Sequence, residues 1–221
     1  MLKVKLRIQI IKILTVRDQA ILNGLLNFGM LNTRQIKTLY FSEVDKRTVL
    51  RRLRKLTKSK WIVRQKTSRG GEIIWTLSAK GAKYLSSDFY LKTINRTALR
   101  HDLAVSDIRI SLDKLYMSSQ WRSSNLHRYK SSSNTSPYAR IPDSIPDWLF
   151  TMQLKKSKTV MAMEVELHFK GKRRMQKVFS MYSDKKSINH VWYLVPNSRF
   201  GEKIIASSKT ILHERGKSWV L

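Results

Sequence analysis

Between Val160 and Lys170 the sequence alternates apolar and titratable side chains with a period of two. Successive side chains of a strand point to opposite faces, so this stretch predicts a strand with two unlike faces. An apolar back face with a carboxylate front is how a core strand presents a metal site. One face carries Glu164, Glu166 and His168, and the other carries only apolar residues: Met161, Met163, Val165, Leu167 and Phe169.

The carboxylates of this strand stand out because the chain as a whole is basic. It has 44 Lys and Arg residues against 15 Asp and Glu residues, which gives a formal net charge of +29. Neighbouring carboxylates disfavour each other's ionisation, so their pairing indicates a cation between them. The positive charge of the whole chain opposes compaction and favours a polyanionic partner, most simply nucleic acid.

An anionic membrane is the rival partner, and the sequence does not favour it. We find no long apolar span and no basic amphipathic helix with an aromatic face. Residues 1–14 interrupt their apolar side chains with charged ones, unlike the apolar region of a signal peptide, and predict a strand or an arm. The chain has no cysteine, which excludes disulfides and thiolate zinc sites, so we expect a cytoplasmic protein.

Residues 1–90 predict a separate amino-terminal domain. A hairpin directly after a basic third helix resembles a winged helix-turn-helix, whose third helix enters the major groove of DNA and whose wing contacts the backbone. The expected elements are helices over 17–28, from about 33 to 40 and after a cap at Ser42, hairpin strands at 61–65 and 72–77, and a helix over 79–85.

The third helix of this domain has a uniformly basic face opposite its apolar stripe of Val49, Leu53 and Leu56. A run of charge is usually a solvated face. Here the sign stays positive over three turns although like charges four residues apart repel, which favours a helix that faces DNA. The resemblance implies that Lys66 and Arg69 lie on the wing and that the third helix places four residues near DNA: Arg47, Arg51, Arg54 and Lys58.

Residues 91–221 predict an α/β domain. A helix from about 95 to 117 is expected to contact both halves of the chain, and His101 within it is assigned a structural role beside Asp102. The polar stretch 118–136 shows little periodicity, and its run 131–136 predicts a flexible loop. Strands are expected over 148–154 and 160–170 and, as part of a mostly parallel sheet, over 190–195; helices are expected after Gly171 and over 200–208, with a short strand at 218–221.

The carboxy-terminal half resembles the PD-(D/E)XK nuclease superfamily. The matching features are Pro146-Asp147 at one strand, Glu164-Val-Glu166 on the next, then a basic helix and another strand. The resemblance implies that the Asp and the first Glu hold Mg²⁺ or Mn²⁺ and that a lysine two residues later positions the attacking water. Glu166 occupies that lysine's place here, so Lys170 or Lys177 would have to supply the amine.

The whole chain resembles the replication-relaxation family of plasmid and conjugative-element proteins. These proteins join a winged helix to a nuclease-like domain and are related to an atypical class of mobilisation relaxases. The expected fold is therefore α/β (α+β overall), with an amino-terminal winged helix-turn-helix and a PD-(D/E)XK nuclease-like α/β domain. The matching stretches are Arg100–Leu112, Ile145–Phe150, Glu164–Leu167 and Lys177–Tyr182.

Two functions follow as hypotheses. The first is a mobile-element protein that binds double-stranded DNA and nicks or relaxes it in mobilisation or replication. Asp147, Glu164 and Glu166 would then bind Mg²⁺ or Mn²⁺ and act with Lys177, which would stabilise charge on the phosphate. A relaxase reaction would use a tyrosine as nucleophile; Tyr182 matches, but its place on a core stripe argues that it packs.

The second hypothesis is a non-catalytic DNA-binding factor in replication, transfer or transcription, with a degenerate nuclease fold. In that case the acidic strand is a surface strand bonded to nearby Lys and Arg. An RNA-binding protein is a third reading, which the wing and the acidic strand disfavour. Proteins of this size often act as homodimers or with a helper, and the sequence leaves that open.

Overall fold

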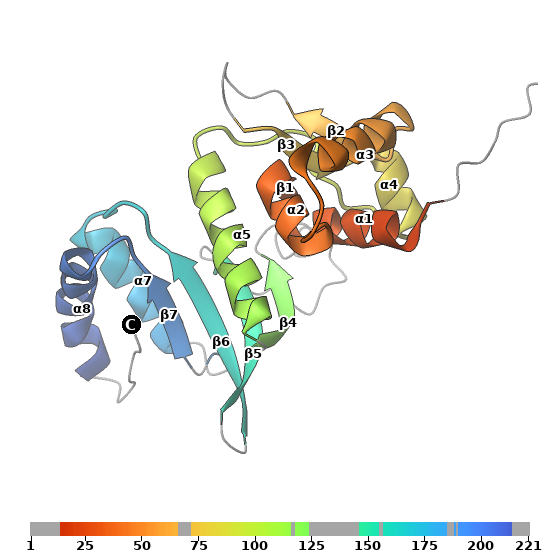
Figure 1. Cartoon of the computed structure of the whole chain (residues 1–221). Helices are drawn as coiled ribbons and strands as arrows, with labels where there is room; N and C mark the ends of the chain where they lie inside the picture. Colours follow the sequence, from red (N-terminus) through yellow and green to blue (C-terminus); the bar gives the residue numbers. More distant parts are fainter. Residues whose placement is uncertain are drawn as a thin grey trace, which may run out of the picture.

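Two small sheets, each with its own helices, make up the mixed α/β structure of the chain (Figure 1). The computed structural model describes residues 14–65, 72–115, 118–123, 146–154, 157–184, 188 and 190–213. Within these residues there are seven helices. Four expected features lie outside the described residues: residues 1–13 of the arm, the wing turn at 66–71, the loop at 131–136 and the strand at 218–221. The division at residues 90 and 91 stays a prediction.

The amino-terminal half follows the predicted order of helices and hairpin. Its elements are α1 (Val16–Phe28), β1 (Met30–Asn32), α2 (Thr33–Tyr40), α3 (Lys46–Lys58), β2 (Ile62–Gln65), β3 (Ile74–Leu77) and α4 (Ala79–Tyr84). The three strands form an antiparallel sheet in the order β1-β3-β2. Sequence analysis missed β1, because three residues are too few to show a period of two.

Local capping chemistry sets where these helices begin and end. Thr15 and Asp18 form a capping box at the start of α1, and Gly29 ends the helix with a φ of 78°, a conformation that glycine adopts without strain. The prediction of Ser42 as the cap of α3 is wrong. The cap is Asp45, whose carboxylate accepts hydrogen bonds from the Arg47 and Thr48 amides at 2.7 and 3.1 Å.

The carboxy-terminal half is built on a four-stranded sheet in the order β4-β5-β6-β7. The expectation of a mostly parallel sheet is wrong, because only the β6–β7 pair is parallel. Residues 155 and 156 alone separate β5 from β6, which forces a hairpin, whereas α7 lies between β6 and β7 and allows a crossover. The elements are α5 (Leu99–Lys114), β4 (Ser118–Ser123), β5 (Trp148–Leu154), β6 (Ser157–Val165), α7 (Lys172–Asp184), β7 (His190–Leu194) and α8 (Ser198–His213).

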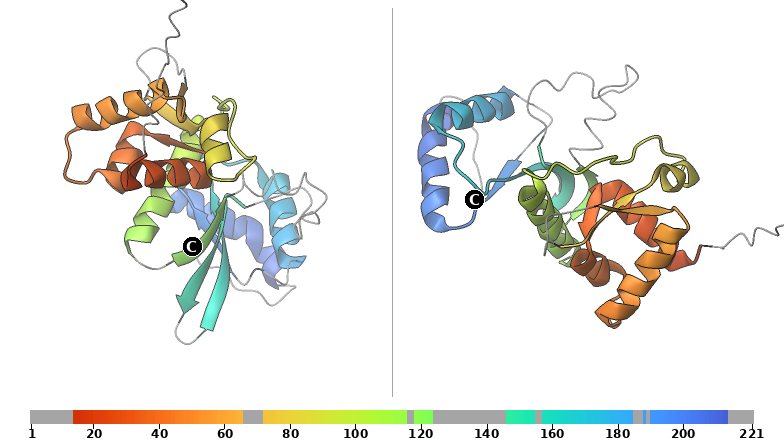
Figure 2. Two further views of the ribbon diagram at one scale, coloured as in Figure 1. Left: turned by 90° about the vertical axis from the view of Figure 1, so that its right-hand side faces the viewer. Right: turned by 90° about the horizontal axis from the view of Figure 1, so that it is seen from above.

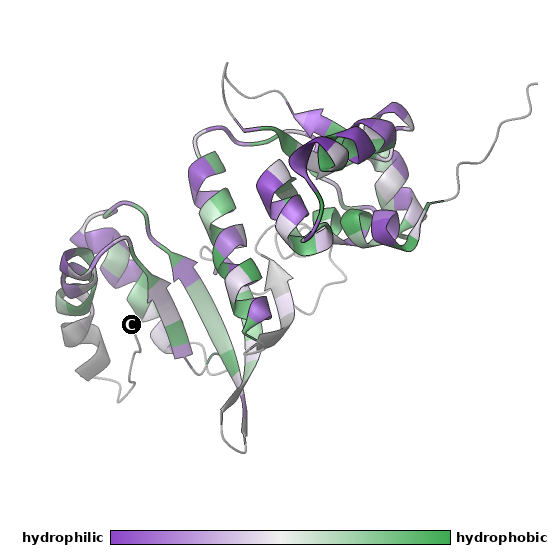
Figure 3. Cartoon of the chain, in the orientation of Figure 1, coloured by the Kyte–Doolittle hydropathy of each residue, from purple (hydrophilic) through white to green (hydrophobic). Residues whose placement is uncertain are grey.

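From Met161 to Val165, strand β6 is buried on both faces. Met161, Met163 and Val165 belong to a core shared with the amino-terminal half, whereas Ala162 packs with residues of α7 and α8 on the other face. Figure 3 shows β6 as hydrophobic over most of its length and hydrophilic at its carboxyl end. Glu164 therefore lies in a covered face rather than on a surface strand.

The predicted strand is too long at its carboxyl end. The Glu166 amide still donates to the Leu194 carbonyl at 2.9 Å, but beyond it the chain leaves the sheet. His168 is exposed and Phe169 is 40 % exposed, so neither lies on a face of the sheet as predicted. The alternation of residue types continues beyond the end of β7. Past that point β7 can no longer supply hydrogen-bond partners for the backbone of this segment.

Helix α5 joins the two halves, as predicted, although it is shorter than expected. Arg34 of α2 forms an ion pair with Asp107 of α5 at 2.7 Å. Gln35 donates from Nε2 to the Leu103 carbonyl at 3.0 Å and to Asp107 Oδ1 at 2.9 Å. None of the described helices has the length and apolar character needed to span a bilayer.

The Arg109 guanidinium of α5 lies among aromatic rings from both halves. Its central carbon is 4.1 Å from the ring centre of Phe28 in α1, 4.4 Å from that of Trp148 in β5 and 5.4 Å from that of Trp121 in β4. Trp121 lies in β4, a strand that the sequence analysis did not predict. Burial lowers the pKa of Arg109, and the nearby Asp113 opposes this shift.

We expect Arg109→Ala to lower the free energy of unfolding by about 2–4 kcal/mol, because it empties a site between three rings and removes cation–π contacts. The measurement is urea unfolding followed by tryptophan fluorescence. Arg100→Ala, on the exposed side of the same helix, is the control and should change stability by less than about 0.5 kcal/mol. Equal effects of the two substitutions would contradict a role of the guanidinium in joining the halves.

Candidate active site

The β5–β6 hairpin brings together acids that lie far apart in the sequence. Its register pairs Trp148 with Met163, so Asp147 comes opposite Glu164. The Asp147 carboxylate accepts a hydrogen bond from the Val165 amide at 2.8 Å. The predicted meeting of residue 147 with the acids of β6 is therefore present in the structure.

Glu164 is a buried acid of the site. It is 9 % exposed, and the Tyr182 hydroxyl of α7 donates a hydrogen bond to its Oε1. Burial raises the pKa of Glu164 to about 8, the negative charge of Asp147 adds to the rise, and the hydrogen bond from Tyr182 opposes it. The site thus holds a carboxyl group that is easily protonated near neutral pH.

Glu166 follows β6 and is 5 % exposed. Its Oε1 accepts a hydrogen bond from the Lys170 ammonium at 2.7 Å. Its Oε2 is buried and has no hydrogen-bond partner among the described residues. Lys170 is one of the two lysines that sequence analysis named for the place taken by Glu166, and it does reach the acids.

His101 of α5 also belongs to this site. Its Nε2 lies 3.1 Å from Asp147 Oδ2 and its Nδ1 lies 3.2 Å from Asp102 Oδ1. These hydrogen bonds, first with Asp102 and then with Asp147, raise the pKa of His101 to about 10. The imidazolium therefore donates to both carboxylates. Sequence analysis gave His101 a structural role, although its place in the matching stretch Arg100–Leu112 was a signal for more.

The other predicted residues lie as follows. Lys177 is exposed on α7, whereas Met175, Phe179 and Tyr182 of the same helix face the sheet, so the catalytic role of Lys177 stays a prediction. The packing of Tyr182 in the core is confirmed. On α3 the basic residues Arg47, Arg51, Arg54 and Lys58 are exposed, while Lys66 and Arg69 lie outside the described residues.

The donor set suits a hard divalent cation. Mg²⁺ in proteins takes one or two carboxylates and completes its shell with water and substrate phosphate oxygens. The unpartnered Oε2 of Glu166 and the mutual repulsion of Asp147 and Glu164 fit such an ion. Within the described part of the chain, however, no three His, Asp or Glu side chains gather into a complete ligand set. The site therefore fits a cation held by two carboxylates rather than by an all-protein cage.

Comparison with known protein families agrees with the order of these elements. The model of the replication-relaxation family matches residues 22–183, from the middle of α1 to the end of α7. The chain belongs to the replication-relaxation family. Membership of the replication-relaxation family indicates a role in replication or mobilisation. No curated protein and no solved structure matches the chain.

In metal-free buffer we expect the free energy of unfolding to fall between about pH 5 and pH 8. The pKa of Glu164 is raised to about 8 in the fold, so its contribution is fully present below its ordinary pKa and is lost as the pH rises toward 8. Glu164→Gln should remove this part of the fall, as measured by urea unfolding at each pH.

Two comparisons make this measurement specific. Glu202→Gln changes an exposed carboxylate of α8 and should leave the pH profile unchanged. His101 contributes to the pH dependence of stability over an overlapping pH range. Because its pKa is raised to about 10, its stabilising contribution is lost as the pH rises from its ordinary pKa toward 10. For this reason the test is the difference between wild type and Glu164→Gln below pH 7. Parallel profiles would contradict the burial of a titrating Glu164.

Proposed function

We propose that this protein of a plasmid or other mobile element binds double-stranded DNA and nicks it during replication or mobilisation. The observation that carries the proposal is the bond between the Asp147 carboxylate and the Val165 amide. This bond fixes an acid from one strand beside the two acids that flank Val165 on the next. A carboxylate group of this kind, in a chain of charge +29, is suited to cleaving a phosphodiester with a divalent cation.

The order of elements around the acids supports this proposal. Asp147 precedes β5, Glu164 and Glu166 lie at the end of the adjacent strand β6, and α7 and β7 follow. That is the order in the nuclease superfamily that the sequence resembles. The parallel β6–β7 pair and its α7 crossover cover the acids from one side. Substrate would approach from the carboxyl end of β6, where the residues from 168 to 170 are exposed.

Basic side chains at this end suit the approach of a phosphate backbone. Four exposed basic residues follow Glu166 in the sequence. Lys170 precedes α7, and the other three lie in its first turn: Lys172, Arg173 and Arg174. Phosphate contacts supply most of the sequence-independent affinity for DNA, so these basic side chains would hold a DNA strand against the site. Lys170 has a second role, since its ammonium already reaches Glu166 and could stabilise charge on the phosphate.

A bound Mg²⁺ or Mn²⁺ would supply Lewis-acid activation of the phosphate and of water. The chain's own residues would prepare the site for it. His101 orients the Asp147 carboxylate through one oxygen, and Tyr182 holds one oxygen of Glu164. Glu166 keeps its Oε2 without a hydrogen bond from the described residues, which leaves that oxygen available as a ligand.

The amino-terminal half would bind duplex DNA. Its first three helices and its three-stranded antiparallel sheet have the order expected of a winged helix-turn-helix. In α3 the side facing the core is apolar, and the opposite side exposes Arg47, Arg51, Arg54 and Lys58. This is the composition expected of a helix that enters the major groove.

A non-catalytic DNA-binding factor is the second candidate, and one observation favours it. Each acid of the site already accepts a hydrogen bond from a protein side chain: Asp147 from His101, Glu164 from Tyr182 and Glu166 from Lys170. A degenerate site would look the same, because these donors can hold the acids without a metal ion.

Plasmid nicking separates the two candidates. If the site is catalytic, supercoiled plasmid should become open circle with Mn²⁺, and Glu164→Gln should slow this by about 100-fold or more, since loss of outer-shell groups alone costs 10- to 100-fold. Glu202→Gln is the matched control and should nick at the wild-type rate. Plasmid that stays intact across divalent metals and candidate origin sequences would leave only the DNA-binding role.

Arg54→Ala should weaken binding to a preferred duplex by about 1–3 kcal/mol if its guanidinium reads a base edge. The measurement is fluorescence anisotropy with a labelled duplex selected from a random pool, at fixed salt. Arg199→Ala on α8, which removes the same charge from an exposed position, should have a much smaller effect. An unchanged preference between the selected duplex and a scrambled one would exclude Arg54 as a base reader.

A further inference from the structure

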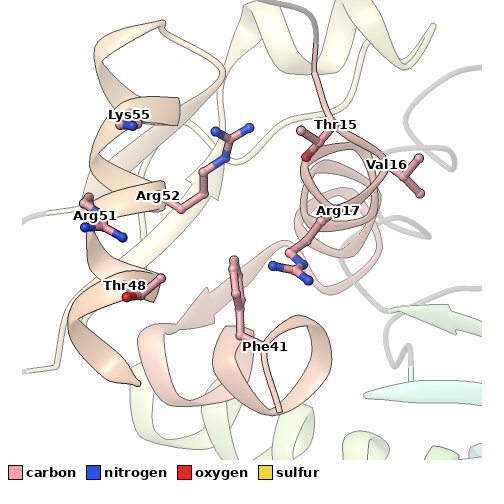
Figure 4. Close-up of a pocket in the computed structure, with 8 residues that line it drawn as sticks. All are labelled: Thr15, Val16, Arg17, Phe41, Thr48, Arg51, Arg52 and Lys55. Atoms are coloured by element: carbon pink, nitrogen blue, oxygen red, sulfur yellow. The ribbon is translucent and has the colours of Figure 1, made fainter. Parts of the chain in front are cut away.

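A basic hollow lies between α1, the end of α2 and α3, away from the acidic site (Figure 4). Its volume is about 620 Å³. In Figure 4 the Arg17 and Arg52 side chains extend from α1 and α3 into the space between the two helices, beside the ring of Phe41. The lining residues are Thr15, Val16, Arg17, Phe41, Thr48, Arg51, Arg52 and Lys55.

Four of the lining residues are cations and none is an acid. The acid beneath the hollow, Asp18, is fully buried and accepts a hydrogen bond from Arg52 Nε at 2.7 Å. Burial by itself would raise the pKa of Asp18, but hydrogen bonds from Arg52 and Thr15 lower it below its ordinary value. Asp18 is thus ionised and is committed to Arg52, so it does not neutralise the other three cations of the lining.

The hydroxyl groups of the hollow are already used as donors. Thr15 Oγ1 donates to Asp18 at 2.8 Å, and Thr48 Oγ1 donates to Asp45 at 2.7 Å. A ligand must therefore be bound by the cations, which requires an anion with more than one acceptor oxygen. A phosphate group has this chemistry, and guanidinium groups match its geometry.

Arg17 is held in place by an aromatic ring. Its guanidinium carbon lies 4.9 Å from the ring centre of Phe41, which is itself buried. Stacking on a ring fixes the plane of the guanidinium and leaves its edge free to donate. The apolar wall also keeps water from one side of the hollow and strengthens charge–charge attraction there.

We propose that this hollow binds a backbone phosphate of the duplex that α3 contacts, an inference that rests on the proposed DNA binding. Arg51 belongs both to the exposed basic stripe of α3 and to the lining of the hollow. The hollow therefore adjoins the side of α3 that would enter the major groove, on the edge that faces α1. The sugar–phosphate backbone bordering the groove passes over this edge, and one phosphate lies between Arg17 and Lys55.

The salt dependence of duplex binding tests this proposal with the full chain. Arg17→Gln, Lys55→Gln and the double variant are compared with Arg199→Gln and Lys203→Gln, which remove the same charges from exposed positions of α8. Because one phosphate binds both side chains, the double variant should reduce the slope of log K against log[salt] by about 0.9, one contact, and no more. The α8 variants should leave the slope unchanged. Thermal unfolding checks that each variant folds.

Neutral phosphates locate the contact on the DNA. In the selected duplex, each phosphate near the site is replaced in turn by a methylphosphonate. One position should weaken binding to wild type and have no effect on binding to the Arg17→Gln/Lys55→Gln double variant. Sensitivity of both proteins at every position would overturn the proposal.

The remaining outcomes separate this inference from the proposed function. Failure of wild type to bind any duplex would overturn both. Duplex binding with the same slope in the hollow and α8 variants would overturn the hollow as a DNA site and leave the α3 stripe standing. Calorimetry with inorganic pyrophosphate tests whether the hollow binds a free anion instead. If Arg17→Gln abolishes pyrophosphate binding but leaves the salt dependence of duplex binding unchanged, the duplex is not the source of the phosphate.

Discussion

The contact of the Arg109 guanidinium with rings from both halves is the interaction on which the arrangement of the molecule depends. Phe28 brings α1 to it, and Trp148 and Trp121 bring β5 and β4. The same helix, α5, carries His101, which holds Asp147 two turns earlier. Asp147 immediately precedes Trp148, so one helix fixes both the junction of the halves and the start of the strand that presents an acid. A shift of α5 would therefore disturb the acidic site and the support of α1 together.

Three acids in the described part of the chain, each buried or half-buried, are paired with a cation. Asp18 is paired with Arg52, Glu166 with Lys170, and Asp147 with His101. A buried carboxylate without such a partner would be protonated or would destabilise the fold. Glu164 comes closest to that situation, with a tyrosine hydroxyl as its donor and a raised pKa. Acids used in this way cannot balance the exposed cations of α3 and α7, and this excess of positive charge supports the proposed binding of DNA.

Sequence analysis could predict the elements whose pattern is long and whose environment is simple. Strand β5 was predicted with its bounds, and α1, α3 and α4 were predicted to within a few residues, because apolar periodicity and capping residues are local signals. β1 was missed because its pairing partner, β3, is remote in the sequence. β4 was missed because a long polar stretch separates it from its partner, β5. His168 and Phe169 were placed on a strand because alternation of residue types does not record where the neighbouring strand ends. The meeting of Asp147 with Glu164 followed from resemblance, whereas the contacts of Lys170 and His101 depend on the fold of other elements.

The relative position of α3 and the acids constrains how the two halves could act on one substrate. α3 and the carboxyl end of β6 lie on either side of α5 (Figure 1 and Figure 2). A duplex held by α3 would have to pass the amino-terminal end of α5, where Arg96 and Arg100 are exposed, before it reached the acids. The phosphodiester at the acidic site would then belong to DNA beyond the base pairs that α3 reads. Under the proposed function, the sequence that α3 recognises and the position that is nicked would therefore be offset along the DNA.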